Sequence, residues 1–287
     1  MFNMDISTAE KFMNGFQIPV KPEILIEIQQ EQAKSYPSPN VIAQIIAKDV
    51  ALSASVLKSV NSPVFGLKRR ITDISQSVIL LGSRNVSNLI TFFELKKGFG
   101  KHSSISHEKY WDLAMETANV MVLLLESLGS KIKCVSEDAY AFGLFRDCGI
   151  PLMAMKYADY KTVLIEVNKQ TETVTTEIED NYYQTYHASV GYFVARSWHL
   201  PKSLCDLILR HHEPEFLRAS DASSEQKDLY ALAKLASNIL SQYHAMKDKA
   251  EWNLVKDSVL GHFGMSDMDY SEIQEDIKET FMIKFGG

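Results

Sequence analysis

Cysteine is scarce in this chain of 287 residues, which contains only Cys134, Cys148 and Cys205. An odd number without CxxC spacing excludes a disulfide framework or a zinc finger and favours a reducing compartment, so we expect a cytoplasmic protein. Long apolar runs are also lacking. The longest, VMVLLL at 120–125, is far below the ~20 residues that span a bilayer. The first residues, MFNMDISTAEKF, do not have the pattern of a signal peptide, so no membrane partner is expected.

An excess of positive charge is absent too. The formal net charge is -6 and the isoelectric point is near 5.8, which argues against a general affinity for nucleic acid or anionic membranes. The chain has 46% hydrophobic and 10% aromatic residues, which is enough for packed cores. We therefore expect a globular protein whose partners are proteins or small molecules.

Apolar residues recur at helical spacing along almost the whole chain, and even the β-leaning KTVLIEV is embedded in helical surroundings. The sequence predicts an all-α protein. Ser38 before Pro39, and Asp49, are placed to begin helices. The glycine- and serine-rich stretch GFGKHSSISHE, residues 98–108, is the best candidate linker. It divides the chain into an N-terminal helical lobe, residues 1–100, and a second helical lobe, residues 101–287.

The second lobe contains an apolar helix, YWDLAMETANVMVLLLESLG, with one face through Trp111, Ala118 and Met121 and another that includes Leu113, so we expect it to be a buried central helix. In the stretch FGLFRDCGIP, residues 142–151, helical spacing turns Asp147 inward. By the same reasoning His187 lies on one apolar stripe, and His211 and His212 on another. A buried carboxylate needs a partner, so these histidines are its candidates. The simplest interpretation is that the four side chains hydrogen-bond to one another in a core.

Several segments resemble a known family. GLFRDCGIPLM resembles the GLLHDIGKLVL turn of the HD superfamily, whose paired His-Asp binds metal in phosphohydrolases. YHASVGYFVARSWHLPKSLCDLILRHHEP resembles the later helices of the HDOD family, and IPVKPEIL, IIAKDVALSASVLKSVNSPVFG and ITDISQSVILLGSRNV resemble its upstream part. The resemblance covers about residues 17–245. It implies a two-lobed all-α HDOD fold with a C-terminal HD-like helical bundle.

This chain departs from the superfamily's metal site at three positions. The early histidine aligns with Leu113, the histidine of the pair with Arg146, and the late aspartate falls near Ser237. What remains is a residual polar cluster, a possible ligand site, made of Arg146, Asp147, His187, His211 and His212. Leucine supplies no lone pair and arginine repels cations, so we expect neither a dinuclear centre nor a catalytic residue, and no cofactor is assigned. Any metal would bind Asp147, His187, His211 and His212.

Two interpretations of Arg146 remain open. Its guanidinium could replace part of the metal's charge beside Asp147, or it could point to solvent from the end of the helix. The basic tip Lys68–Arg70 is read as solvated surface rather than a docking site for an acidic partner or a phosphate. Cys148 is read as an inert core thiol rather than a redox sensor.

The resemblance implies a non-catalytic module of bacterial signal transduction that binds a signalling protein in trans or a small ligand. The alternative is a residual metal-dependent phosphohydrolase acting on nucleotides or cyclic dinucleotides. A third possibility is a small-molecule sensor whose ligand fills the gap between the lobes.

Overall fold

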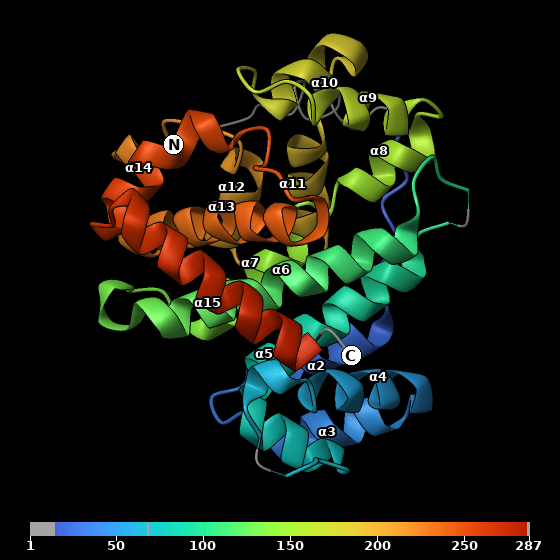
Figure 1. The fold of residues 1–287 in the computed structure, drawn as a ribbon. Coiled ribbons are helices and arrows are strands. Elements are labelled where there is room, and N and C mark those ends of the chain that lie inside the picture. The colour runs from blue at the N-terminus through green and yellow to red at the C-terminus, as the bar shows by residue number, and fades with distance from the viewer. Residues whose placement is uncertain (1–14, 68, 101, 286–287) are drawn as a thin grey trace. The chain divides into compact units, whose positions relative to one another are not determined.

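The computed structural model describes residues 15–67, 69–100 and 102–285. Within these ranges the chain forms helices and their connections, without a strand, which confirms the all-α prediction. The chain divides into two compact units. One is Pro19–Phe99, and the other is Gly100–Gly287 together with the residues up to Ile18 (Figure 1). Among the described residues that precede Pro19, Phe16 packs on Tyr157 at a ring-centroid distance of 6.1 Å.

The Pro19–Phe99 unit is a small helical bundle. Its elements are α2 (Glu23–Gln32), α3 (Pro39–Ala47), α4 (Val50–Val60), the 3₁₀ helix η1 (Pro63–Phe65) and α5 (Ile74–Gly98). Two of the helices begin at aspartate caps, which satisfy backbone N–H groups that have no partner within the helix. Asp49 Oδ1 accepts from Leu52 N at 2.9 Å, and Asp73 Oδ1 accepts from Gln76 N at 3.0 Å. The helices α3 and α4 both pack on α5.

The other unit contains the remaining elements. They are α6 (His107–Leu128), η2 (Gly129–Lys131), α7 (Ser136–Phe145), α8 (Ile150–Lys156), α9 (Tyr160–Val167), α10 (Thr175–Tyr183), α11 (His187–Ser197), α12 (Lys202–Arg210), η3 (Phe216–Arg218), α13 (Ser224–Ala245), α14 (Trp252–Phe263) and α15 (Asp267–Phe285). Helix α6 packs on α7 and α13, and α15 crosses α6 and α13, as Figure 1 shows. The helix α13 begins with a complete capping box between Ser223 and Gln226.

The helix α6 is the central apolar element of this unit. With its 3₁₀ extension it is the one helix in the described ranges whose length and composition would allow it to cross a membrane, and 56% of that apolar window is buried in the fold. Trp111, Ala118 and Met121 are buried as predicted. Leu113 is different, because 46% of it is exposed. The prediction that Leu113 belongs to a second buried face is therefore wrong, since its side chain borders a cavity instead of packing fully against a neighbouring helix.

Candidate functional site

The stretch FGLFRDCGIP covers the end of α7, the turn that follows it and the start of α8. Two glycines hold this turn against its neighbours. A Cβ at Gly143 would lie 2.4 Å from Ala118 Cα on α6, and a Cβ at Gly149 would lie 2.0 Å from the backbone oxygen of His187 on α11. Only glycine permits approaches this close. The two contacts therefore fix Arg146 and Asp147 between α6 and the first residue of α11.

Asp147 and the three histidines meet at one point. His187 opens α11, and His211 and His212 directly follow α12. One ligand atom from each of Asp147, His187, His211 and His212 lies within 4.8 Å of the others. Asp147 Oδ1 is 3.2 Å from His211 Nε2 and 3.6 Å from His187 Nε2, and His187 Nε2 is 3.0 Å from His212 Nε2. The structure thus brings together all four residues that the sequence analysis singled out as possible metal ligands.

Each histidine ring is oriented through its other nitrogen. His187 Nδ1 lies 2.7 Å from Glu179 Oε2, His212 Nδ1 lies 2.7 Å from Glu251 Oε2, and His211 Nδ1 lies 2.7 Å from the backbone oxygen of Ile208. Each of these oxygens accepts a hydrogen bond from an Nδ1–H group, which leaves each Nε2 facing the shared centre. A second group that fixes the tautomer in this way is the usual arrangement around histidines that bind metal.

Arg146 also points into the cluster. Its Nε donates to Asp147 Oδ2 at 3.0 Å, and its Nη1 donates to the backbone oxygen of Ala233 at 3.0 Å and to Ser237 Oγ at 2.6 Å. Only 12% of the side chain is exposed. Of the two interpretations left open by the sequence, the solvent-facing one is wrong, because three acceptors on the turn and on α13 draw the guanidinium inward.

The ionisable side chains of the cluster have pKa values shifted in different directions. Burial alone would lower the pKa of His187, but the carboxylates of Glu179 and Asp147 raise it to about 10. Burial lowers the pKa of His211 and takes that of His212 well below its ordinary value. Burial would raise the pKa of Asp147, yet Arg146 and the hydrogen bonds from His187 and His211 hold it well below its usual range. In the absence of a metal, His187 therefore carries the proton of the cluster.

The donor set fits a single metal ion. Neutral His211 can donate to only one of its two acceptors, Ile208 O and Asp147 Oδ1, so the other contact calls for a cation. Between His187 and His212 the extra proton of His187 can bridge the two Nε2 atoms, which face each other, and a bound cation would replace that proton. Zinc bound at ~2.0–2.1 Å by four ligands separates them by about 3.3 Å. Three of the six separations, 3.0, 3.2 and 3.6 Å, lie around that value, and all lie within 4.8 Å.

A second ion lacks comparable donors. Leu113 supplies no ligand atom, Ser237 Oγ accepts from Arg146, and the guanidinium occupies the other oxygen of Asp147. A fixed cation at hydrogen-bonding distance from a carboxylate opposes a metal on the same oxygen. The residues fit one ion and do not fit two.

A cavity of about 150 Å³ adjoins the cluster and is lined by Tyr110, Leu113, Lys234 and Ser237 as well as by Arg146 and the three histidines. The hydroxyl of Tyr110 is buried and has no hydrogen-bond partner among the described residues. An unpartnered hydroxyl next to a polar cavity is a ready hydrogen-bonding group for a ligand or ordered water. The chemistry of the site thus extends beyond the histidine cluster.

Four contributing residues escaped the sequence analysis, namely Tyr110, Glu179, Lys234 and Glu251. Glu179 is fully buried and also accepts from the Tyr160 hydroxyl, while Lys234 Nζ pairs with Glu251 Oε2 at 3.1 Å. For Lys234 a signal existed, since a single lysine interrupts the apolar helical run LYALAKLASNIL. Glu179 and Glu251 lie in polar segments where acidic residues are common, so nothing local distinguished them.

Comparisons with known proteins agree with this fold. The model of the HDOD domain matches residues 18–214. An uncharacterised protein from Treponema pallidum (strain Nichols) is 28% identical over 196 residues, which is 68% of this chain and 37% of that protein. The chain thus spans little more than a third of the length of this curated relative.

Three solved structures share the fold at low sequence identity. An HDOD domain protein of unknown function from Geobacter sulfurreducens has a TM-score of 0.70 and 20% identity, with 97% of this chain and 96% of that chain covered. A candidate signal transduction protein from Marinobacter aquaeolei VT8 has a TM-score of 0.71 and 17% identity, with 100% and 67% covered. A candidate phosphohydrolase from Shewanella amazonensis SB2B has a TM-score of 0.68 and 17% identity, with 96% and 93% covered.

Proposed function

The chain belongs to the HDOD domain family, and we propose that it is a non-catalytic regulatory module of signal transduction that binds a partner protein or a small ligand. The observation that carries this proposal is the inward position of Arg146. Its guanidinium is held by Asp147, Ala233 and Ser237. A permanent cation thus stands beside the carboxylate that a hydrolytic centre would use for its metals.

The ligand count supports the same conclusion. Metal-dependent hydrolysis needs an open coordination position, where a bound water is activated and the substrate enters. Asp147, His187, His211 and His212 would together fill a tetrahedral sphere, and a closed sphere is typical of structural metal sites. When bound there, an ion would cross-link α11, the segment after α12 and the α7–α8 turn. The chain's own residues would then hold the fold of this unit rather than activate water.

The resemblance of the fold to the Marinobacter protein, which is described as a candidate signal transduction protein, is in keeping with a regulatory role. We further propose that the protein acts in the cytoplasm on a partner in trans, without nucleic acid or membrane. The net charge of -6 favours proteins or small ligands over phosphate polymers.

A metal-dependent phosphohydrolase acting on nucleotides or cyclic dinucleotides is the second candidate. The convergence of four donor atoms within 4.8 Å favours it, as does the unpartnered Tyr110 hydroxyl at the adjoining cavity. In this case Tyr110 would orient the substrate, and the fourth ligand would have to leave the ion to open a position for water.

The two candidates separate in one set of measurements. Protein purified without chelator is analysed for bound metal and assayed with nucleotides and cyclic dinucleotides in the presence of zinc, manganese or iron. We expect at most one ion per chain, loss of that ion in His187→Ala, and no turnover. His244→Ala is the matched control, because His244 lies at the surface and pairs with Glu116. Turnover that disappears in His187→Ala but persists in His244→Ala would establish the phosphohydrolase and refute the regulatory proposal.

A further inference from the structure

The surface of the Pro19–Phe99 unit carries a second hollow, of about 1140 Å³. It lies between the last two turns of α4 and the loop that joins α4 to α5. Lys58 and Leu57 line it from the helix, and Pro63, Leu67, Arg69 and Arg70 line it from the loop. Arg69 and Arg70 of the basic tip noted in the sequence therefore line a hollow, whereas Lys68 lies outside the described residues.

The loop is closed at its base by one side chain. The Asn61 amide donates from Nδ2 to the backbone oxygen of Ile71 at 2.7 Å, and its Oδ1 accepts from Ile71 N at 2.7 Å. The same Nδ2 donates to Leu57 O at 2.7 Å, and the Ile71 side chain is buried. This pair of hydrogen bonds between the two ends of the loop fixes Arg69 and Arg70 next to the end of α4. The hollow therefore exists before any partner binds.

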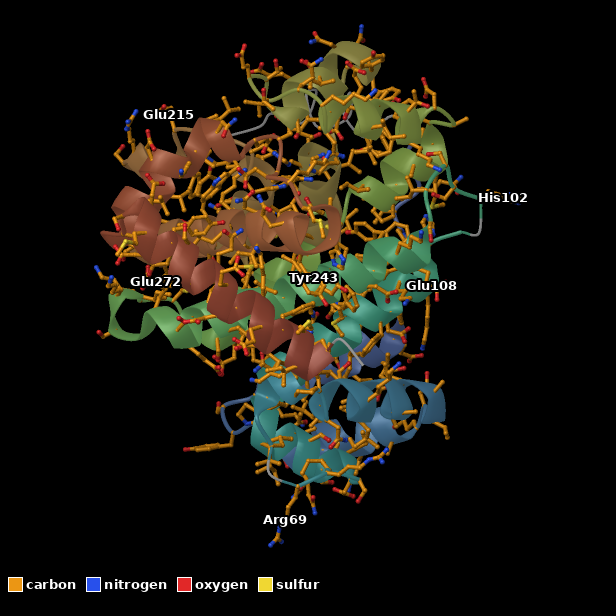
Figure 2. The ribbon with its side chains drawn as sticks, in the orientation of Figure 1. Arg69, His102, Glu108, Glu215, Tyr243 and Glu272 are labelled. Carbon is orange, nitrogen blue, oxygen red and sulfur yellow. The ribbon has the colours of Figure 1, made fainter. Side chains whose placement is uncertain are left out.

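The cations around the hollow are not neutralised by the unit itself. Lys58, Arg69 and Arg70 are all exposed, and Figure 2 shows the Arg69 side chain extending away from the helices. None of the three forms an ion pair with a carboxylate in the described ranges. Other lysines of the unit do, for example Lys48 with Glu27 at 2.7 Å. The three charges at the hollow are thus available to an anionic partner.

Positive charge is concentrated in the unit that carries this hollow. Residues 19–99 hold ten of the 30 basic and six of the 36 acidic residues, a formal charge of +4, which leaves -10 for the rest of the chain. A local positive field on an otherwise acidic protein steers an acidic partner to this unit and away from the remainder.

The exposure and the apolar lining of the hollow favour a protein segment over a small anionic ligand. Its lining residues are mostly exposed, so it cannot enclose a small molecule on most sides as ligand pockets do. Leu57, Pro63 and Leu67 add an apolar floor that a nucleotide phosphate would not use. We propose that this hollow docks an extended protein segment in which acidic residues alternate with apolar ones. The inference rests on the proposed regulatory function, because it supplies the surface for the partner in trans.

The test uses the full chain and a fluorescein-labelled peptide rich in glutamate with spaced leucines, with binding followed by fluorescence anisotropy. The double variant Arg69→Glu/Arg70→Glu reverses two charges on the wall, and we expect it to weaken binding at least about tenfold. Lys96→Glu is the matched control, since Lys96 is exposed in the same unit but lies outside the hollow. We expect it to change the affinity less than about twofold. Circular dichroism and melting temperature establish that both variants fold.

Three outcomes would overturn the docking proposal: binding of a lysine-rich peptide as tight as that of the acidic one, equal weakening by Lys96→Glu, or full competition by inorganic pyrophosphate. The last of these would assign the hollow to a small anion. A leucine-free glutamate peptide that binds equally well would likewise contradict the role of the apolar floor. These results are independent of the metal and turnover measurements, so the regulatory function and its docking surface can fail separately.

Discussion

Arg146 donates a hydrogen bond from Nη1 to Ser237 Oγ at 2.6 Å. The two residues are 91 positions apart in the chain, and each stands where the sequence resemblance places a metal ligand. By that resemblance a cation and a hydroxyl stand at the positions of an imidazole and a carboxylate, and in this structure they bond to each other. This pair joins the α7–α8 turn to α13 on one side of Asp147.

Arg146→Ala is expected to destabilise the protein. The change removes three hydrogen bonds and leaves Asp147, of which 25% is exposed, without its cation. Truncating one partner of a largely buried pair costs about 2–4 kcal/mol of unfolding free energy. Urea unfolding in the presence of chelator measures this loss of unfolding free energy. Arg218→Ala is the control, because its pair with Glu215 is exposed and contributes almost nothing. Equal stability of the two variants would contradict the inward position of Arg146.

Glu179→Gln tests the orientation of His187. Glu179 accepts from the backbone N–H of His187 at 2.9 Å and from its Nδ1 at 2.7 Å. An amide of the same shape loses the charge and cannot accept all of these bonds, so a loss of about 1–3 kcal/mol in unfolding free energy is expected. A parallel zinc titration should show weaker binding. Glu177→Gln on the same helix is exposed and should match the unchanged protein in both measurements.

Gly149→Ala probes the contact that fixes the turn against α11. The new Cβ would lie 2.0 Å from His187 O and 2.6 Å from Gly191 N, so α8 and α11 must separate. Overpacking of this kind costs about 2–4 kcal/mol, and a lower melting temperature together with lost metal binding is the expected result. Gly261→Ala in α14 meets nothing within 4 Å. It should leave the melting temperature unchanged or raise it slightly. A tolerated Gly149→Ala would show that the turn is not held there.

The buried thiols predict a loss of stability at alkaline pH. Burial raises the pKa of Cys134 and of Cys205 to about 12, whereas the unfolded thiol titrates near ~8.5. Above pH ~9 the unfolded chain therefore binds fewer protons than the folded one, and the free energy of unfolding falls as pH rises towards 12. Urea midpoints at several pH values measure this slope.

The double variant Cys134→Ala/Cys205→Ala should have a shallower slope than the unchanged protein, and an identical slope would contradict the assignment to these thiols. Cys148 is fully buried, and burial raises its pKa also. All three native thiols should react slowly with iodoacetamide at pH 8 and rapidly in urea. Slow reaction of Cys148 would support its interpretation as an inert core thiol.

The helices and the family were largely accessible from the sequence. Asp49 caps the first turn of its helix with its side chain, and Pro39 takes the first helical position after Ser38, whose side chain makes no cap hydrogen bond. Both starts were predicted because these signals act within one turn. Helical spacing predicted that Asp147, His187, His211 and His212 point inward, and the structure brings them together at the helix ends, with Asp147, His211 and His212 just beyond the last helical residue. Leu113 was predicted to be buried but is partly exposed, since helical spacing identifies an apolar side chain but does not show whether another helix covers it.

What the sequence determined by itself is which residue types are present on each helical face, because periodicity and caps act over a few residues. Tertiary structure alone decided that Arg146 turns inward and that Glu179, Lys234 and Glu251 complete the cluster. These outcomes depend on acceptors brought together from distant helices. A buried charge pairs with the group that packing places within hydrogen-bonding distance. The distance between residues on separate helices cannot be read from the local sequence.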